Sequence, residues 1–193
     1  MTPHRRRLPH VSPEGAALFL TWHLHTSLPA SVLPPPRSLA SGQAFVWLDR
    51  QLDTLRRGPR YLHRTDIAQI VVNSIHKGVE LEHYELGAYV VMPNHVHLLI
   101  RPSIAPERLM KSLKGASARE ANRVLGRTGE PFWRKESYDH WVRNPSEFQK
   151  IRMYIEANPV KAGLARSPQD YPSVERGRRD ESRRGTQECA TLS

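Results

Sequence analysis

The sequence predicts an α+β fold in which helices pack against an antiparallel sheet. Residues 17–26 (ALFLTWHLHT) alternate between apolar and polar side chains, as a strand with one buried face does. Residues 84–92 and 95–101 form two apolar runs on either side of Pro93-Asn94, a dipeptide typical of turns. Two runs joined by so short a connection predict a β-hairpin, which is an antiparallel unit.

Apolar residues at helical spacing predict four helices around these strands. These helices begin near Phe45, Thr65, Pro106 and Asn144. The apolar side of the first helix is made of Phe45, Leu48, Leu52 and Leu55. A short strand is expected at 138–142. Asn144 can cap the last helix, which Asn158-Pro159 should stop near Ala157 because proline disfavours helical geometry in the residue before it. The order strand, helices, hairpin, helix, strand, helix favours a ferredoxin-like antiparallel sheet with helices on one face.

The chain is strongly basic. Its 193 residues hold 29 Lys and Arg against 19 Asp and Glu, a net charge of +10. Within residues 15–165 the counts are 20 and 13, or +7, so the excess lies mainly in the part expected to fold. A polyanion, nucleic acid above all, is the natural partner of such a surface, although a basic charge by itself also suits a merely soluble protein.

Three regions are expected: a basic flexible N-terminus over 1–14, a catalytic domain over 15–165, and a polar, disordered tail over 166–193. No apolar run approaches the roughly 18 residues that span a bilayer. The single cysteine, Cys189, allows no internal disulfide, as in a reducing compartment. We therefore expect a cytoplasmic protein without a membrane partner.

The run VVMPNHVHLLIR places His95 and His97 two positions apart on a predicted strand. Successive strand residues point to opposite faces, so both imidazoles project from one face and can offer two ligands to a metal. On the last helix, Tyr154 and Asn158 are four residues apart and share a side. A metal held by the histidines and Asn158 would polarise a phosphate that Tyr154 attacks. Taken singly, each of these residues is more often structural, and Tyr138 is a competing nucleophile.

The motifs VVMPNHVHLL and YIEANPVKAG resemble those of the HUH-type single-tyrosine transposases, in particular the REP-associated branch. The resemblance covers roughly residues 16–165. It implies a ferredoxin-like sheet with a separate helix that bears the nucleophile Tyr154, and a metal site made by His95, His97 and Asn158. The implied ion is Mg²⁺ or Mn²⁺, whereas two imidazoles alone would suit Zn²⁺ or Ni²⁺ equally well.

The resemblance further implies an enzyme that cleaves and rejoins single-stranded or hairpin DNA through a 5′-phosphotyrosine intermediate, as a monomer or homodimer associated with the nucleoid. A domesticated hairpin-binding protein that no longer cleaves is the main alternative. A replication initiator or relaxase is the third, and the short chain counts against it. His140 is expected to be structural.

Basic side chains on and after the third helix are candidate phosphate contacts. They are Lys111, Lys114, Arg119, Arg123, Arg134, Lys135 and Arg143. Trp133 and Trp141 could stack on unpaired bases, but packing in the core is at least as good an interpretation of both.

Overall fold

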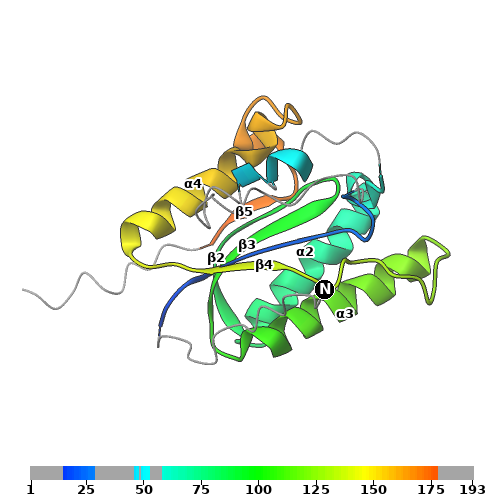
Figure 1. Cartoon of the computed structure of the whole chain (residues 1–193), viewed down its shortest axis with the longest axis horizontal. Coiled ribbons are helices and arrows are strands. Elements are labelled where there is room, and N and C mark those ends of the chain that lie inside the picture. The colour runs from blue at the N-terminus through cyan, green and yellow to red at the C-terminus, as the bar shows by residue number, and fades with distance from the viewer. Residues whose placement is uncertain (1–14, 29–45, 48, 53–57, 178–193) are drawn as a thin grey trace, which may run out of the picture.

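Five strands form one antiparallel sheet in a computed structural model, which describes residues 15–28, 46–47, 49–52 and 58–177 (Figure 1). The spatial order is β4-β1-β3-β2-β5. The strands are β1 (Leu18–His23), β2 (Tyr84–Val91), β3 (His95–Pro102), β4 (Tyr138–Trp141) and β5 (Val174–Arg176). The helices are α2 (Thr65–Glu80), α3 (Pro106–Val124) and α4 (Pro145–Lys161), with short 3₁₀ turns η1 (Tyr61–His63) and η2 (Pro168–Asp170).

The first four strands have the ferredoxin-like arrangement. In the chain they alternate with helices as β1-α2-β2-β3-α3-β4, and in the sheet β1 and β3 are neighbours flanked by β4 and β2. Helices α2 and α3 cover one face, while α4 lies on the other, as Figure 1 shows. The predicted fold class, including the separate fourth helix, is confirmed. Within the described part of the chain, no helix is both long and apolar enough to cross a membrane.

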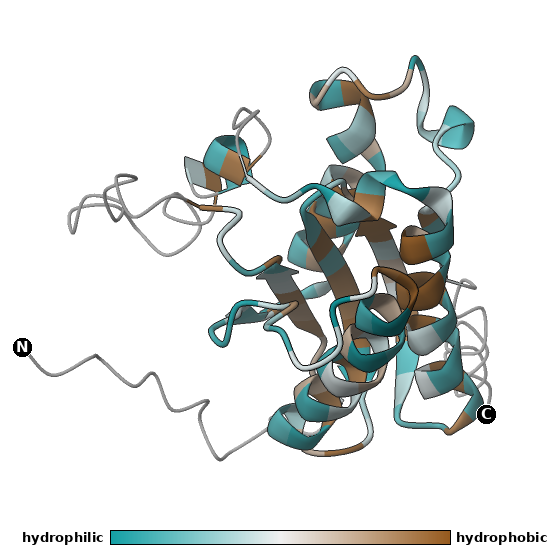
Figure 2. Ribbon diagram, turned by 90° about the vertical axis from the view of Figure 1, so that its right-hand side faces the viewer, coloured by the Kyte–Doolittle hydropathy of each residue, from teal (hydrophilic) through white to brown (hydrophobic). Residues whose placement is uncertain are grey.

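The alternation along the strands divides the core into two layers (Figure 2). Val96, Leu98 and Ile100 of β3 are fully buried in the layer beneath α2 and α3. Leu99 faces the opposite layer, where it packs with Phe19 and Ile155 beneath α4. Side chains at alternate positions of one strand thus stabilise both layers, which leaves the α4 face of β3 free to present His95 and His97 toward that helix.

Helix α4 begins where the sequence predicts and ends later. The Asn144 side chain accepts a hydrogen bond from the Glu147 N–H at 2.9 Å, which caps the first turn. The helix does not stop before Pro159 but continues to Lys161, because Gly163 at φ +68° supplies the actual stop. The Gly163 and Leu164 N–H groups donate to the carbonyls of Val160 and Pro159, a Schellman arrangement.

The predicted disordered tail is wrong for residues 166–177. Val174–Arg176 forms β5 on the edge of β2, and the Tyr171 hydroxyl donates to the Val91 carbonyl at 3.0 Å. Pairing with an existing strand supplies the order that the polar sequence of this segment does not indicate. Residues 178–193 and 1–14 lie outside the described residues, so the expected N-terminal and C-terminal regions otherwise stay predictions.

The first predicted helix is only partly described. Residues 46–47 and 49–52 are helical, and Leu52 is buried. Phe45, Leu48 and Leu55 lie outside the described residues, as does the proline-rich segment from 29 to 38.

Candidate active site

Both motif histidines are completely buried on the α4 face of β3. Their Nε2 atoms lie 3.1 Å apart and their ring centroids 4.7 Å apart. The structure therefore places His95 and His97 on one face of β3, as their two-residue spacing predicts. Two polar rings in such a position are costly to bury unless each ring nitrogen has a partner.

Asn94, in the turn before β3, determines how His95 is protonated. The Asn94 side-chain amide donates to the Leu52 carbonyl at 2.9 Å, which fixes the amide orientation and leaves Oδ1 to accept. His95 Nδ1 lies 2.7 Å from that oxygen and must donate to it. The neutral His95 ring consequently presents an unprotonated Nε2 to the interior of the site, which is the form that binds a metal ion.

Thr21 of β1 supports His97 in the same way. Thr21 pairs with His97 in the β1–β3 register, and its hydroxyl lies 2.7 Å from His97 Nδ1. A hydroxyl can accept from Nδ1–H, which again leaves Nε2 available. Each histidine is thus oriented from behind by a short polar side chain.

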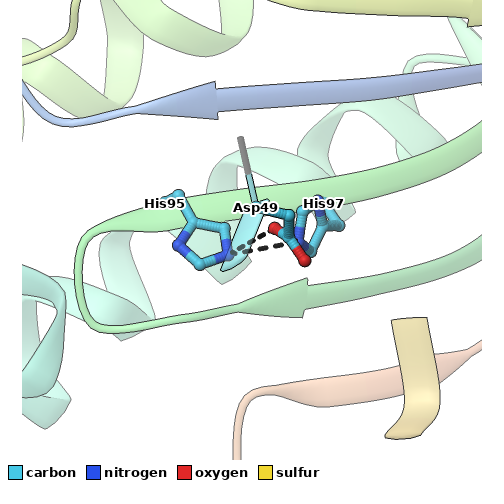
Figure 3. Close-up of side chains that lie close together, drawn as sticks. All are labelled: Asp49, His95 and His97. Carbon is cyan, nitrogen blue, oxygen red and sulfur yellow. Dashed lines mark hydrogen bonds and ion pairs between the residues drawn. The ribbon is translucent and has the colours of Figure 1, made fainter. Parts of the chain in front are cut away.

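Asp49 completes a buried group of three potential metal ligands, and the sequence analysis missed it. Its carboxylate is 2% exposed, and Oδ1 lies 2.8 Å from His97 Nε2 and 3.4 Å from His95 Nε2 (Figure 3). One ligand atom from each residue falls within 4.8 Å of the others. A signal was present: Asp49 is four residues after Phe45 and three before Leu52, so a charged residue interrupts the apolar stripe of the first predicted helix.

The charge state of Asp49 follows from its neighbours. Burial alone would raise the pKa of this carboxyl, but the imidazoles of His97 and His95, by charge and hydrogen bonding, hold its pKa well below the usual value. Asp49 is therefore a carboxylate, and its buried negative charge faces the two imidazoles.

Helix α4 brings Tyr154 and Asn158 to the other carboxylate oxygen. The Tyr154 hydroxyl donates to Asp49 Oδ2, and Asn158 Nδ2 donates to the same atom at 3.1 Å. The Tyr154 ring lies edge-on to His97, with centroids 5.9 Å apart, and Lys161 Nζ lies 4.8 Å from the Tyr154 ring centroid. The structure thus brings together the four residues predicted at the site, while their chemical roles stay predictions.

The donor set fits a divalent cation. Ligands about 2.0–2.1 Å from one ion lie about 3 Å from one another in octahedral geometry, which matches the 2.8–3.4 Å separations of the three ligand atoms. Asn158 Oδ1 is also buried and lacks a hydrogen-bond partner among the described residues. In the present orientation Asn158 points its nitrogen at Asp49, so ligation through Oδ1 requires the amide to turn over.

The predicted phosphate contacts divide into two groups. Lys111, Arg119, Lys135 and Arg143 are exposed. Lys114 donates to the backbone carbonyls of residues 134, 135 and 136, and burial lowers its pKa to about 8. The remaining two, Arg123 and Arg134, form ion pairs with Glu120 and Glu136.

The aromatic residues that the sequence offered for base stacking or as a second nucleophile lie in or near the core. Trp133 is 8% exposed and donates to Ser117 Oγ at 3.0 Å, and Trp141 packs against the layer beneath α2 and α3, which favours the core interpretation of both. Tyr138 packs edge-on against Phe19. His140 pairs with Glu147 at 3.0 Å and so joins β4 to the first turn of α4.

Comparisons with known proteins identify a matching family and a similar fold. Residues 57–158, more than half of the chain, match the family model described as "Transposase IS200 like". A solved REP-associated tyrosine transposase bound to a REP hairpin is 20% identical, with a TM-score of 0.58 over 90% of this chain and 82% of that one. A candidate transposase from Deinococcus radiodurans R1 is 19% identical over 82% of this chain and 98% of that one, with a TM-score of 0.37. No curated protein matches the sequence.

Proposed function

Because this chain belongs to the IS200-like transposase family, we propose that it cleaves and rejoins single-stranded or hairpin DNA with Tyr154 as the nucleophile. The observation that carries the proposal is the hydrogen bond from the Tyr154 hydroxyl to Asp49, the carboxylate that also faces His95 and His97. A nucleophile needs a fixed position, and this contact supplies one.

His95, His97 and Asp49 would hold the divalent ion, with Asn158 as a further ligand. Such an ion supplies Lewis-acid polarisation of a phosphate oxygen. The oxygen-rich chemistry of the substrate and the family favour Mg²⁺ or Mn²⁺. The residues that carry the chemistry meet within a single chain, which supports a site that works in a monomer and does not require a homodimer.

The proposed step is a transesterification. A bond forms between the Tyr154 phenolic oxygen and phosphorus as the bond from phosphorus to the 3′-oxygen breaks. The phenol loses one proton and the departing 3′-oxygen gains one, so the products are a 5′-phosphotyrosine and a free 3′-hydroxyl. A 3′-hydroxyl on another strand can reverse the step, which is how the strands are rejoined. The similar solved structure, which is bound to a REP hairpin, supports hairpin DNA as the substrate class. The protein would encounter such DNA at the nucleoid.

The test is covalent capture on DNA. Hairpin oligonucleotides with single-stranded flanks, labelled at the 3′ end, are incubated with the protein and Mg²⁺, and adducts are resolved on a denaturing gel. We expect the 3′ label to migrate with the wild-type protein and with Tyr138→Phe, but not with Tyr154→Phe, with His95→Ala or in EDTA. An adduct formed by Tyr154→Phe would refute the assignment of the nucleophile. A hairpin shift in a native gel without any adduct across a broad hairpin set would instead support the non-cleaving alternative.

A further inference from the structure

Asp49 lies outside both sequence motifs, and its two oxygens face different halves of the site. Oδ1 faces the imidazole nitrogens, whereas Oδ2 accepts hydrogen bonds from Tyr154 and Asn158 (Figure 3 shows the histidine side). We propose that Asp49 couples the two halves: Oδ1 is an anionic ligand of the divalent ion, and Oδ2 holds the Tyr154 hydroxyl beside it. This inference rests on the proposed function and adds to it a residue that positions the nucleophile.

The first argument is the arrangement of donors and acceptors. Asn94 forces the proton of a neutral His95 ring onto Nδ1, so His95 Nε2 presents a lone pair toward Asp49 Oδ1, 3.4 Å away. Two acceptors that face each other in a buried site repel unless a positive group lies between them. Asn94 thus fixes this tautomer for His95, and the Thr21 hydroxyl can accept from Nδ1–H of His97 in the same tautomer, which would turn both Nε2 lone pairs toward Asp49.

The second argument is charge. Asp49 is 2% exposed, and both histidines are fully buried. No lysine or arginine forms an ion pair with Asp49 among the described residues; its ion-pair partners are the two histidines. A buried carboxylate is costly unless a cation balances it. A divalent ion beside Oδ1 provides that balance and leaves the imidazoles neutral, as metal ligation requires.

The third argument is that one rigid group serves both partners. A carboxylate is planar, so the position of Oδ1 at the ligands fixes the position of Oδ2 at the Tyr154 hydroxyl. Any change in metal occupancy at Oδ1 therefore reaches Tyr154 through Asp49. By linkage, the placement of Tyr154 must in turn affect metal affinity.

Asp49→Asn separates this role from a merely structural one. The substituted amide can keep its oxygen toward Tyr154 and Asn158 and turn its N–H toward the His97 Nε2 lone pair, so the metal-free variant is expected to fold. The same N–H occupies the place of the ion. Asp66→Asn is the matched control, because Asp66 is exposed and pairs with Arg64 at 2.7 Å, at the start of α2.

Two measurements without DNA test the inference. Mn²⁺ binding is measured by calorimetry, and 3-fluorotyrosine at position 154 reports the surroundings of the hydroxyl by ¹⁹F NMR during a Mg²⁺ titration. We expect Asp49→Asn to weaken Mn²⁺ binding at least tenfold and to abolish the Mg²⁺-dependent shift of the fluorine signal, with a melting temperature in EDTA close to that of the wild type. Asp66→Asn should leave both readouts unchanged. Wild-type Mn²⁺ affinity in Asp49→Asn, or a fluorine shift that persists in it, overturns the proposal.

Cleavage assays then distinguish this inference from the proposed function. If Asp49→Asn loses metal and the fluorine response, but the wild-type protein cleaves no hairpin, Asp49 has the proposed role and the DNA chemistry is wrong. If the wild type and Asp49→Asn form the Tyr154 adduct at equal rates, the DNA chemistry stands and the role of Asp49 is refuted.

Discussion

Thr21→Val should weaken metal binding although Thr21 is no ligand. Valine has nearly the shape of threonine and favours strands equally, so β1 should be undisturbed. The substitution removes the hydroxyl that lies 2.7 Å from His97 Nδ1, at a position only 2% exposed. Without this acceptor the ring gains by moving its proton to Nε2, the atom that faces Asp49.

The size of the effect has two parts. Loss of a partner that orients a metal-binding histidine costs about 10–100-fold in affinity, equivalent to about 1.4–2.7 kcal/mol. A buried nitrogen left without a partner also costs about 1–3 kcal/mol of folding free energy. At about 2–4 °C per kcal/mol for a chain of this size, the melting temperature in EDTA should fall by about 2–12 °C.

The assay is Mn²⁺ calorimetry together with thermal unfolding in EDTA. Thr21→Ser is the control, because it keeps the hydroxyl while it loses the methyl group. We expect serine to bind Mn²⁺ within about threefold of the wild type and valine to lie at least tenfold below it. Equal affinities for the wild type and the valine variant would refute the reasoning that Thr21 selects the His97 tautomer.

Three further outcomes follow from the described contacts. Burial and, next in size, the charge of Arg134 lower the pKa of His23 from 6.5 to about 4. The folding free energy should therefore be full above pH 6.5 and fall by about 3 kcal/mol as the pH drops toward 4. Urea titrations should show a flatter dependence of stability on pH for His23→Gln, but not for the exposed control His25→Gln. Lys114→Met should cost about 0.5–1.5 kcal/mol by removing its hydrogen bonds to three exposed backbone carbonyls, whereas Lys111→Met should change stability by less than about 0.5 kcal/mol and instead reduce the salt dependence of DNA binding. Asn144→Ala should cost about 1 kcal/mol in chemical denaturation, and Asn144→Ser should restore most of it.

The parts of the site that sequence reasoning found are those set by local geometry. Alternation along a strand places His95 and His97 on one face, and the four-residue spacing on a helix places Tyr154 beside Asn158. The start of α4 was equally accessible, because the residues of a helix cap are neighbours in the chain. Each of these inferences needs only a few consecutive residues.

The parts that were missed depend on tertiary contacts. Asp49 meets Tyr154 across 105 positions of the chain, a distance over which periodicity carries no information. The polar segment that forms β5 has no strand pattern and gains order from the edge of β2. The extension of α4 through Pro159 depends on where Gly163 allows the chain to turn, and a proline in the last turn removes only one hydrogen bond.

The strand β5 has a consequence for the behaviour of the protein at high concentration. Without it, the backbone groups of β2 on that side would form an open edge, which is a template for pairing with other chains and for aggregation. Gly177 continues this cover, since its N–H donates to the Gly87 carbonyl and a side chain at this position would collide with the Leu86 carbonyl oxygen. Truncation before Val174 should therefore make the protein prone to self-association. The residues that follow the two sequence motifs thus protect the protein from self-association.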